Sequence, residues 1–255
     1  MSGTTAPPRF GEDLTEDRFL SGRLVVRQPA AGYRAAIAPV ILAAALPVRA
    51  GDSVVDLGTG VGTAALCLLE RQPRLAVAAL ELHPGLAALA RENACLNGFA
   101  DRLTVIEGDV RTIPEAVVPG TFDHACCNPP YLARDQGRGS PSELRRLATQ
   151  EGEAELEDWI AAGLRLLRAK GSLTVVHRAD ALPRLLAALE GRAGGIVIAP
   201  LWPRAGQPAS RVVVRVRKDS RAPARLAPGL VLHEDDGRYT AAAESVLRHG
   251  QPFDL

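Results

Sequence analysis

The stretch Asn128-Pro129-Pro130-Tyr131 follows a short apolar run, residues 122–127, that predicts a buried strand. Proline lacks the N–H group that a strand ladder needs, so we expect Asn128 where the chain leaves its sheet. Open α/β folds bind their ligands at this edge. The Asn128 side-chain oxygen and the Pro129 carbonyl can accept both hydrogens of a planar amino group. Tyr131 can stack on a planar base, a contact worth about 1–3 kcal/mol.

A planar amine needs help to react, because delocalisation of its lone pair makes the nitrogen a poor nucleophile. Two acceptors fixed by rigid prolines can localise that lone pair and aim it at an electrophilic carbon. With a sulfonium methyl donor, the transfer requires neither a metal nor a conventional general base. The stretch therefore predicts a catalytic site made of Asn128, Pro129, Pro130 and Tyr131. The alternative is a rigid turn in which Asn128 bonds only local backbone groups.

A second motif lies upstream, where Gly58, Gly60 and Gly62 separate a predicted strand from a predicted helix. Glycines at such a turn let the backbone approach a ligand closely. The turn alone is compatible with a dinucleotide, with S-adenosylmethionine, or with no ligand at all. The third glycine falls one residue earlier than in the usual dinucleotide fingerprint, which favours S-adenosylmethionine.

Carboxylates accompany the glycine turn. Asp56 precedes it and would repel a pyrophosphate while suiting the ammonium group of a methionine moiety. Glu81 ends the next predicted strand, where a carboxylate suits the two hydroxyls of a ribose. Asp109 follows a third strand and could accept the adenine amine of the donor, or it could be a solvated turn residue.

The elements that must position these motifs alternate between strand and helix from residue 53, which is typical of a parallel sheet. We expect strands at residues 53–57, 75–80, 103–106, 122–127, 172–176, 195–199 and 211–217, and helices at residues 63–71, 84–97, 156–167 and 181–189. The last two strands follow each other without a helix and predict an antiparallel hairpin. The expected fold is α/β and Rossmann-like, with a mostly parallel seven-stranded sheet, helices on both faces and a C-terminal antiparallel hairpin.

Composition excludes some classes of partner. Apolar residues make up 47% of the 255 residues, and the formal net charge is +1, so no global basic field indicates a polyanion. The four cysteines form no C-x-x-C pair, and we expect neither a metal site nor a disulfide framework. The longest apolar run, residues 37–46, is too short for a membrane span. We expect a cytoplasmic protein with no membrane partner.

With its motifs in this order, the chain resembles the class I, Rossmann-like methyltransferases, and more narrowly the bacterial valine-tRNA adenine-37 N6-methyltransferase family. The closer likeness covers nearly the whole chain and includes Thr15-Glu16-Asp17-Arg18-Phe19-Leu20, Gly32-Tyr33-Arg34, His177-Arg178, Pro203-Arg204 with Pro208-Ala209, Leu232-His233-Glu234 and Gly237-Arg238-Tyr239-Thr240.

The resemblance implies S-adenosylmethionine as methyl donor and the adenine N6 beside the anticodon of tRNA as acceptor. The residues expected at the donor are Asp56, Gly58, Thr59, Gly60, Gly62, Glu81, Leu82, Asp109 and Asn128. One departure concerns the donor side, because the family has an Asp early in the N-terminal helix where this chain has Ala38.

The order of the predicted elements also suggests how the chain is organised. Residues 1–50 are expected to form a tail, a short strand and a cap helix. Residues 51–218 would form the methyltransferase domain, and residues 219–255 a C-terminal extension packed on the same domain.

Two groups of arginines could contact tRNA. Arg134, Arg138, Arg145 and Arg146 lie in the polar stretch after the acceptor motif and could bind phosphates. Arg211, Arg215 and Arg217 share one face of a predicted strand because strand side chains alternate. The alternatives are that the first group is only solvated and that the second protects a sheet edge.

The leading hypothesis is methyl transfer from S-adenosylmethionine to N6 of an adenine in RNA. A protein-glutamine N5-methyltransferase is the enzymatic alternative, because the Asn128 site can hold any planar amino group. An RNA-binding protein with lost catalysis is the other, motivated by Ala38. An NAD-linked dehydrogenase is disfavoured, because no His, Arg and Asp set for hydride transfer accompanies the glycine turn.

Overall fold

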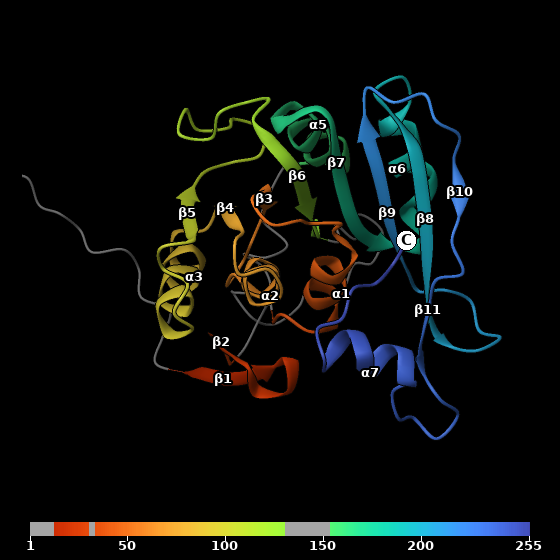
Figure 1. The fold of residues 1–255 in the computed structure, drawn as a ribbon, viewed down its shortest axis with the longest axis horizontal. Coiled ribbons are helices and arrows are strands. Elements are labelled where there is room, and N and C mark those ends of the chain that lie inside the picture. Colours follow the sequence, from red (N-terminus) through yellow and green to blue (C-terminus); the bar gives the residue numbers. More distant parts are fainter. Residues whose placement is uncertain (1–12, 31–33, 131–153) are drawn as a thin grey trace, which may run out of the picture.

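The computed structural model describes residues 13–30, 34–130 and 154–255. Its centre is a sheet of nine strands in the order β10-β8-β9-β7-β6-β3-β4-β5, with β11 also paired to β8 (Figure 1). The strands are β3 (Ser53–Leu57), β4 (Ala76–Glu81), β5 (Leu103–Glu107), β6 (Phe122–Cys127), β7 (Leu167–Arg178), β8 (Ala193–Arg204), β9 (Arg211–Lys218), β10 (Arg225–Leu226) and β11 (Leu230–His233). The predicted α/β, Rossmann-like class is confirmed.

The predicted count of seven strands was too low. All seven expected strands are present, and the chain after Lys218 adds β10 and β11 in parallel alongside β8. β10 has two residues and β11 has four, which is too few to show a periodic pattern, so the sequence did not predict these strands. The predicted antiparallel hairpin is confirmed by β8 and β9, and β9 is also antiparallel to β7.

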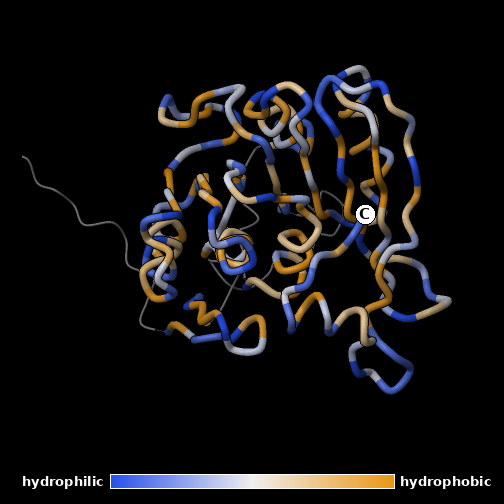
Figure 2. The backbone as a smooth tube through the Cα atoms, in the orientation of Figure 1, coloured by the Kyte–Doolittle hydropathy of each residue, from blue (hydrophilic) through white to orange (hydrophobic). Residues whose placement is uncertain are grey.

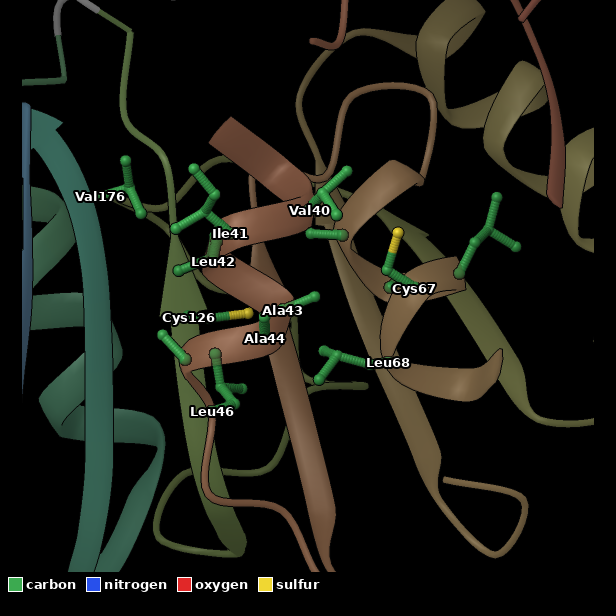
Figure 3. Packing of buried hydrophobic residues seen from close by; sticks show 14 of the residues in the cluster. Val40, Ile41, Leu42, Ala43, Ala44, Leu46, Cys67, Leu68, Cys126 and Val176 are labelled. Carbon is green, nitrogen blue, oxygen red and sulfur yellow. The ribbon is translucent and has the colours of Figure 1, made fainter. Parts of the chain in front are cut away.

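Helices cover both faces of the sheet, as predicted. On one face, α1 (Ile37–Ala45), α2 (Thr63–Arg71), α3 (Pro84–Leu96) and α7 (Ala241–Leu247) share a hydrophobic cluster with Val54 and Cys126. On the other, α5 (Leu156–Leu166) and α6 (Leu182–Leu189) pack with Val55 and Cys127. Neighbouring residues of a strand serve opposite faces because side chains alternate. Figure 3 shows Cys126 against α1, and in Figure 2 hydrophobic segments run along the central strands.

The N-terminal segment contains a hairpin that the sequence only half predicted. β2 (Leu24–Pro29) was expected, whereas β1 (Leu14–Phe19) was missed because four of its six residues are polar. β1 pairs antiparallel with β2 and joins it through the 3-10 turn η1 (Leu20–Gly22). The first hydrophobic cluster runs from Leu20 to Leu255, so the described parts of all three predicted segments pack together. The boundaries at residues 50 and 218 stay predictions.

Two asparagines, Asn93 in α3 and Asn97 just after its end, attach the hairpin to the domain. The Asn93 side-chain oxygen accepts from the Arg27 N–H at 2.8 Å, and its amide donates to the Arg27 carbonyl at 2.9 Å, as a neighbouring strand would. The same amide donates to the Val61 carbonyl in the glycine turn at 2.9 Å. Asn97 bonds the N–H and carbonyl of Val25 in the same way. One fully buried side chain, Asn93, therefore joins β2 to the glycine turn.

Replacing Asn93 with Leu keeps its approximate size but removes its partners from two part-buried groups of Arg27 and from the buried Val61 carbonyl. We expect a loss of unfolding free energy of about 3 kcal/mol. Urea denaturation at an unchanged m-value would measure it. Glu92→Ala, on the exposed side of the same helix, is the matched control and should stay near wild type. Equal stability of Asn93→Leu and wild type would contradict this role for Asn93.

Candidate active site

The predicted motifs meet because four neighbouring strands end at one level. Leu57 in β3 pairs with Cys127 in β6 and with Leu80 in β4. Gly58 and Asn128 are therefore the next residues of two adjacent strands, whose spacing is about 4.8 Å. Glu81 pairs with Glu107 of β5, which Gly108 and Asp109 follow. The acceptor motif, the glycine turn and both carboxylates thus form one row at the carboxyl edge of the sheet.

The glycine turn adopts a backbone that other residues disfavour. Gly58, Gly60 and Gly62 have φ values of 65°, 60° and 89°, in the left-handed region that favours glycine. The Gly60 N–H donates to the Glu81 carboxylate at 2.7 Å. The Thr59 hydroxyl donates to Asp56 at 2.6 Å. The strand ends on either side thus hold the turn in place.

Both acidic partners of the turn are buried. Glu81 is 1% exposed, and its other oxygen accepts from the His83 N–H at 2.9 Å. Burial raises the pKa of Glu81 to about 7, against the opposing effect of the hydrogen bonds from His83 and Gly60. Burial likewise raises the pKa of Asp56 to about 6, and the hydrogen bond from Thr59 opposes the rise. The donor side is therefore poised to titrate near neutral pH.

The Asp56 side chain is buried, and both of its oxygens already accept hydrogen bonds. One carboxylate oxygen accepts from Thr59 and the other from the Cys126 thiol at 3.5 Å. Its predicted contact with the donor ammonium group stays a prediction.

A small cavity of about 10 Å³ lies beside the turn. Its lining includes Glu81, Leu82 and Asp109, as the sequence predicted, together with Trp159 of α5. Asp109 bonds the Arg111 guanidinium at 2.7 Å, and these hydrogen bonds lower the pKa of its carboxyl. The cavity thus offers carboxylates beside apolar walls.

Two residues that the sequence analysis missed adjoin the turn. The Trp159 ring lies so close to Gly58 that a Cβ there would come within 2.5 Å of it. The Thr63 hydroxyl, at the first residue of α2, is buried and has no hydrogen-bond partner within the described ranges. Trp159 follows the acceptor motif by some 30 residues, and no local pattern connects the two.

These residues fit S-adenosylmethionine. The glycines admit close backbone approach, and Glu81, Leu82 and Trp159 supply a buried carboxylate and apolar walls for such a ligand. Among the residues that the structure describes, no group of three or more His, Cys, Asp and Glu could hold a metal ion.

The acceptor motif is partly described. Asn128 is half-buried and Pro129 is buried, at the end of β6. His177, near the end of β7, lies opposite the level of Pro129, and burial lowers the pKa of its imidazole. Tyr131, Arg134, Arg138, Arg145 and Arg146 lie outside the described residues, so their predicted roles stay predictions.

The three strand arginines lie at different levels along β9. Arg211 pairs with Arg178 at the carboxyl edge of β7. Arg215 is half-buried and donates to the Ala45 and Leu255 carbonyls at 3.2 and 2.9 Å. Arg215 and Arg217 both line a recess toward the opposite edge, where Arg217 is level with His124, about 13 Å along β6 from Asn128.

The alternative prediction, that these arginines protect a sheet edge, was wrong. β9 lies between β7 and β8 and is not an edge strand. The alternation could not reveal this interior place of β9, and contact of the three arginines with tRNA stays a prediction.

Comparisons with known proteins agree with this geometry. The methyltransferase small domain family matches residues 34–190. A tRNA1(Val) (adenine(37)-N6)-methyltransferase from Aeromonas hydrophila is 32% identical over 204 residues, covering 79% of this chain and 83% of the relative. A protein of the same name from Actinobacillus pleuropneumoniae is 28% identical over 214 residues, covering 82% and 86%.

Solved structures show the same fold. A structure described as a predicted O-methyltransferase from Agrobacterium tumefaciens has a TM-score of 0.71 at 25% identity and covers 85% of this chain and 98% of that one. An S-adenosylmethionine-dependent O-methyltransferase from Thermotoga maritima has a TM-score of 0.54 at 17% identity, over 75% and 68% of the two chains.

Fold, site and comparisons define a class I, Rossmann-like methyltransferase that uses S-adenosylmethionine. The chain belongs to the methyltransferase small domain family. The resemblance seen in the sequence is thereby confirmed. Among the described residues, no helix is long and apolar enough to cross a membrane.

The raised pKa of Glu81 predicts a pH-dependent donor site. An ionised carboxylate can accept two hydroxyls, whereas protonation removes an acceptor, so affinity for S-adenosylhomocysteine should rise as pH increases through about 7. We expect about a fivefold to tenfold increase between pH 6 and pH 8, measured by calorimetry. Glu81→Gln should bind more weakly with a flat profile, and the exposed Glu115→Gln should keep the wild-type profile. A wild-type profile in Glu81→Gln would assign the titration to another group.

Proposed function

We propose that this chain transfers a methyl group from S-adenosylmethionine to the exocyclic N6 of an adenine in tRNA, namely adenine-37 of a valine tRNA. The observation that carries the proposal is the adjacency of Asn128 to Gly58 at the ends of paired strands. It sets an amine-holding motif beside the donor turn. The alignments with relatives named for this activity cover most of each relative and most of this chain. A tRNA substrate implies that the enzyme works in the cytoplasm.

One set of residues would bind the methyl donor and another the acceptor. S-adenosylmethionine supplies an activated methyl group when bound. Gly58, Gly60 and Gly62 would let the backbone close around it, with Thr59 and Asp56 bracing the turn. Glu81 would accept the ribose hydroxyls, and Asp109 the adenine amine, beside Leu82.

On the acceptor side, the Asn128 oxygen and the Pro129 carbonyl would accept the two hydrogens of the target amine. Tyr131 would stack on the base. Because Pro129 and Pro130 restrict the backbone, the two acceptor oxygens need to move little when the substrate binds.

The choice of nitrogen over oxygen as acceptor rests on hydrogen-bond counting. A hydroxyl offers one hydrogen, whereas an amino group offers the two that Asn128 and Pro129 can accept. The structural likeness to a protein described as an O-methyltransferase concerns the fold, which hosts many acceptors. The acceptor motif therefore decides in favour of an amine.

Ala38 bears on the donor side. It is the second residue of α1, partly buried against the first hydrophobic cluster, and it offers no polar atom beyond its backbone. The buried Glu81 and the unpartnered Thr63 hydroxyl remain as polar groups for the donor. We infer that the site stays competent without an acid at residue 38.

Asn128→Ala should reduce turnover by about 100-fold to 1,000-fold, because it removes an acceptor aligned with charge that develops during transfer. Affinity for S-adenosylhomocysteine should stay close to wild type, since Glu81 and Asp56 hold the donor turn. Methyl transfer to tRNA and calorimetry measure the two quantities. Wild-type turnover in the variant would refute the acceptor assignment.

Incubation with labelled donor, total tRNA and total protein should place label in the tRNA, and mass spectrometry of its nucleosides should identify N6-methyladenosine. Label in protein glutamine would support the alternative enzyme instead. Retention of tRNA without any transfer would identify a binding protein that has lost catalysis. Purified valine tRNA compared with an adenine-37 substituted transcript then tests the position.

A further inference from the structure

A recess of about 540 Å³ lies on the side of α1 away from the acceptor strand. Three separate parts of the chain form it: the β1–η1 hairpin, the start of α1, and the C-terminal segment around α7. Figure 1 shows the hairpin and α7 along the same, lower side of the molecule. The residues that matter here are Arg18, Phe19, Ile37, Val40, Tyr239 and Arg248. Two of the family-like segments, around Arg18 and Tyr239, thus meet at a place that the methyl-transfer chemistry does not use.

The recess lies at the level of the acceptor motif. Arg215, which is level with Thr174 and Cys126 in the sheet, donates to the Ala45 carbonyl at the end of α1. Ile37 lies eight residues earlier in this helix, about 12 Å along its axis. Pro130 lies four residues beyond Cys126, about 13 Å along the strand direction.

Helix and strand run in opposite directions, so both displacements point to the same edge. Figure 3 shows Ile41 beside Val176 and Ala43 beside Cys126, which agrees with this orientation. The start of α1 therefore reaches the edge at which Asn128 lies.

The lining combines aromatic rings with cations. Phe19 and Tyr239 are half-buried, and Tyr239 stacks on His233 with ring centroids 4.9 Å apart. Arg18 is exposed and makes no hydrogen bond or ion pair within the described residues. The Arg248 guanidinium makes an exposed contact with Glu244 at 3.5 Å, a weak kind of ion pair. No described lining residue is acidic.

The hairpin wall is held in an unusual backbone. Leu20, Ser21 and Gly22 have consecutive φ values of 51°, 57° and 86°, and non-glycine residues rarely adopt this region. Ser21 donates to the Arg248 carbonyl at 3.0 Å, and Arg23 donates to the His249 carbonyl at 2.9 Å. These bonds hold the strained turn against the segment after α7, and strained backbone of this kind is concentrated at functional sites.

We propose that this recess binds an unpaired nucleotide of the RNA substrate near the target adenine. The base lies against Phe19 and Tyr239, and Arg18 and Arg248 contact the neighbouring phosphates. Stacking on aromatic rings and cationic contacts to the backbone are how proteins hold single-stranded nucleic acid. The inference rests on the proposed tRNA substrate and adds a second contact point to it.

Two matched pairs of variants test the recess with full-length enzyme and tRNA. Tyr239→Leu keeps apolar volume but loses stacking, and it should raise KM for tRNA about tenfold, whereas Tyr239→Phe should stay near wild type. Arg18→Gln should raise this KM and reduce the slope of log KM against log salt by about 0.7. Its control is Arg49→Gln, an exposed arginine at the opposite edge of the sheet.

The kcat and the affinity for S-adenosylhomocysteine should stay unchanged in all four variants, which a merely structural effect would not allow. If the wild type methylates tRNA and Tyr239→Leu and Arg18→Gln keep its KM and salt slope, the recess does not bind the RNA. If the wild type methylates no tRNA, the proposed function fails instead. The recess is then judged by binding of a single-stranded oligonucleotide, where equal affinity of wild type and Tyr239→Leu would overturn it.

Discussion

The parallel register between β6, β3, β4 and β5 is the constraint on which the site depends. Pairing of Leu57 with both Cys127 and Leu80 brings three strand ends to one level. The groups that follow those ends are far apart in the sequence but adjacent in the row. A slip of one residue would exchange the two faces of a buried strand, so packing on both sides of the sheet fixes this register.

Buried carboxylates give the donor side its character. Glu81 and Asp56 lose hydration, and hydrogen bonds from Gly60, His83 and Thr59 offset part of that cost. Their pKa values therefore lie close to neutral pH rather than near those of solvated acids. Perturbed groups of this kind concentrate where ligands bind. The same hydrogen bonds fix the glycine turn, so the position of the turn depends on the protonation of Glu81 and Asp56.

The terminal segments depend on the central domain and also shape it. Asn93 joins β2 to the glycine turn, while Ser21 and Arg23 bond the segment after α7. Arg215 ties β9 to the end of α1. The two ends of the chain meet over α1 and form a wall near the acceptor edge. With a net charge of only +1, recognition of a polyanion must rely on such local groupings.

The sequence by itself determined the fold class and the position of each motif at a strand end, because periodicity, glycines and prolines act locally. It placed the boundaries of β6 and α2 correctly, since Pro129 and Gly62 mark them. Only the tertiary structure decided the roles of Arg215 and Arg217, the presence of Trp159 beside Gly58, and the addition of β10 and β11 to the sheet. Those outcomes depend on which distant segments pair and pack, and no short-range pattern encodes that choice.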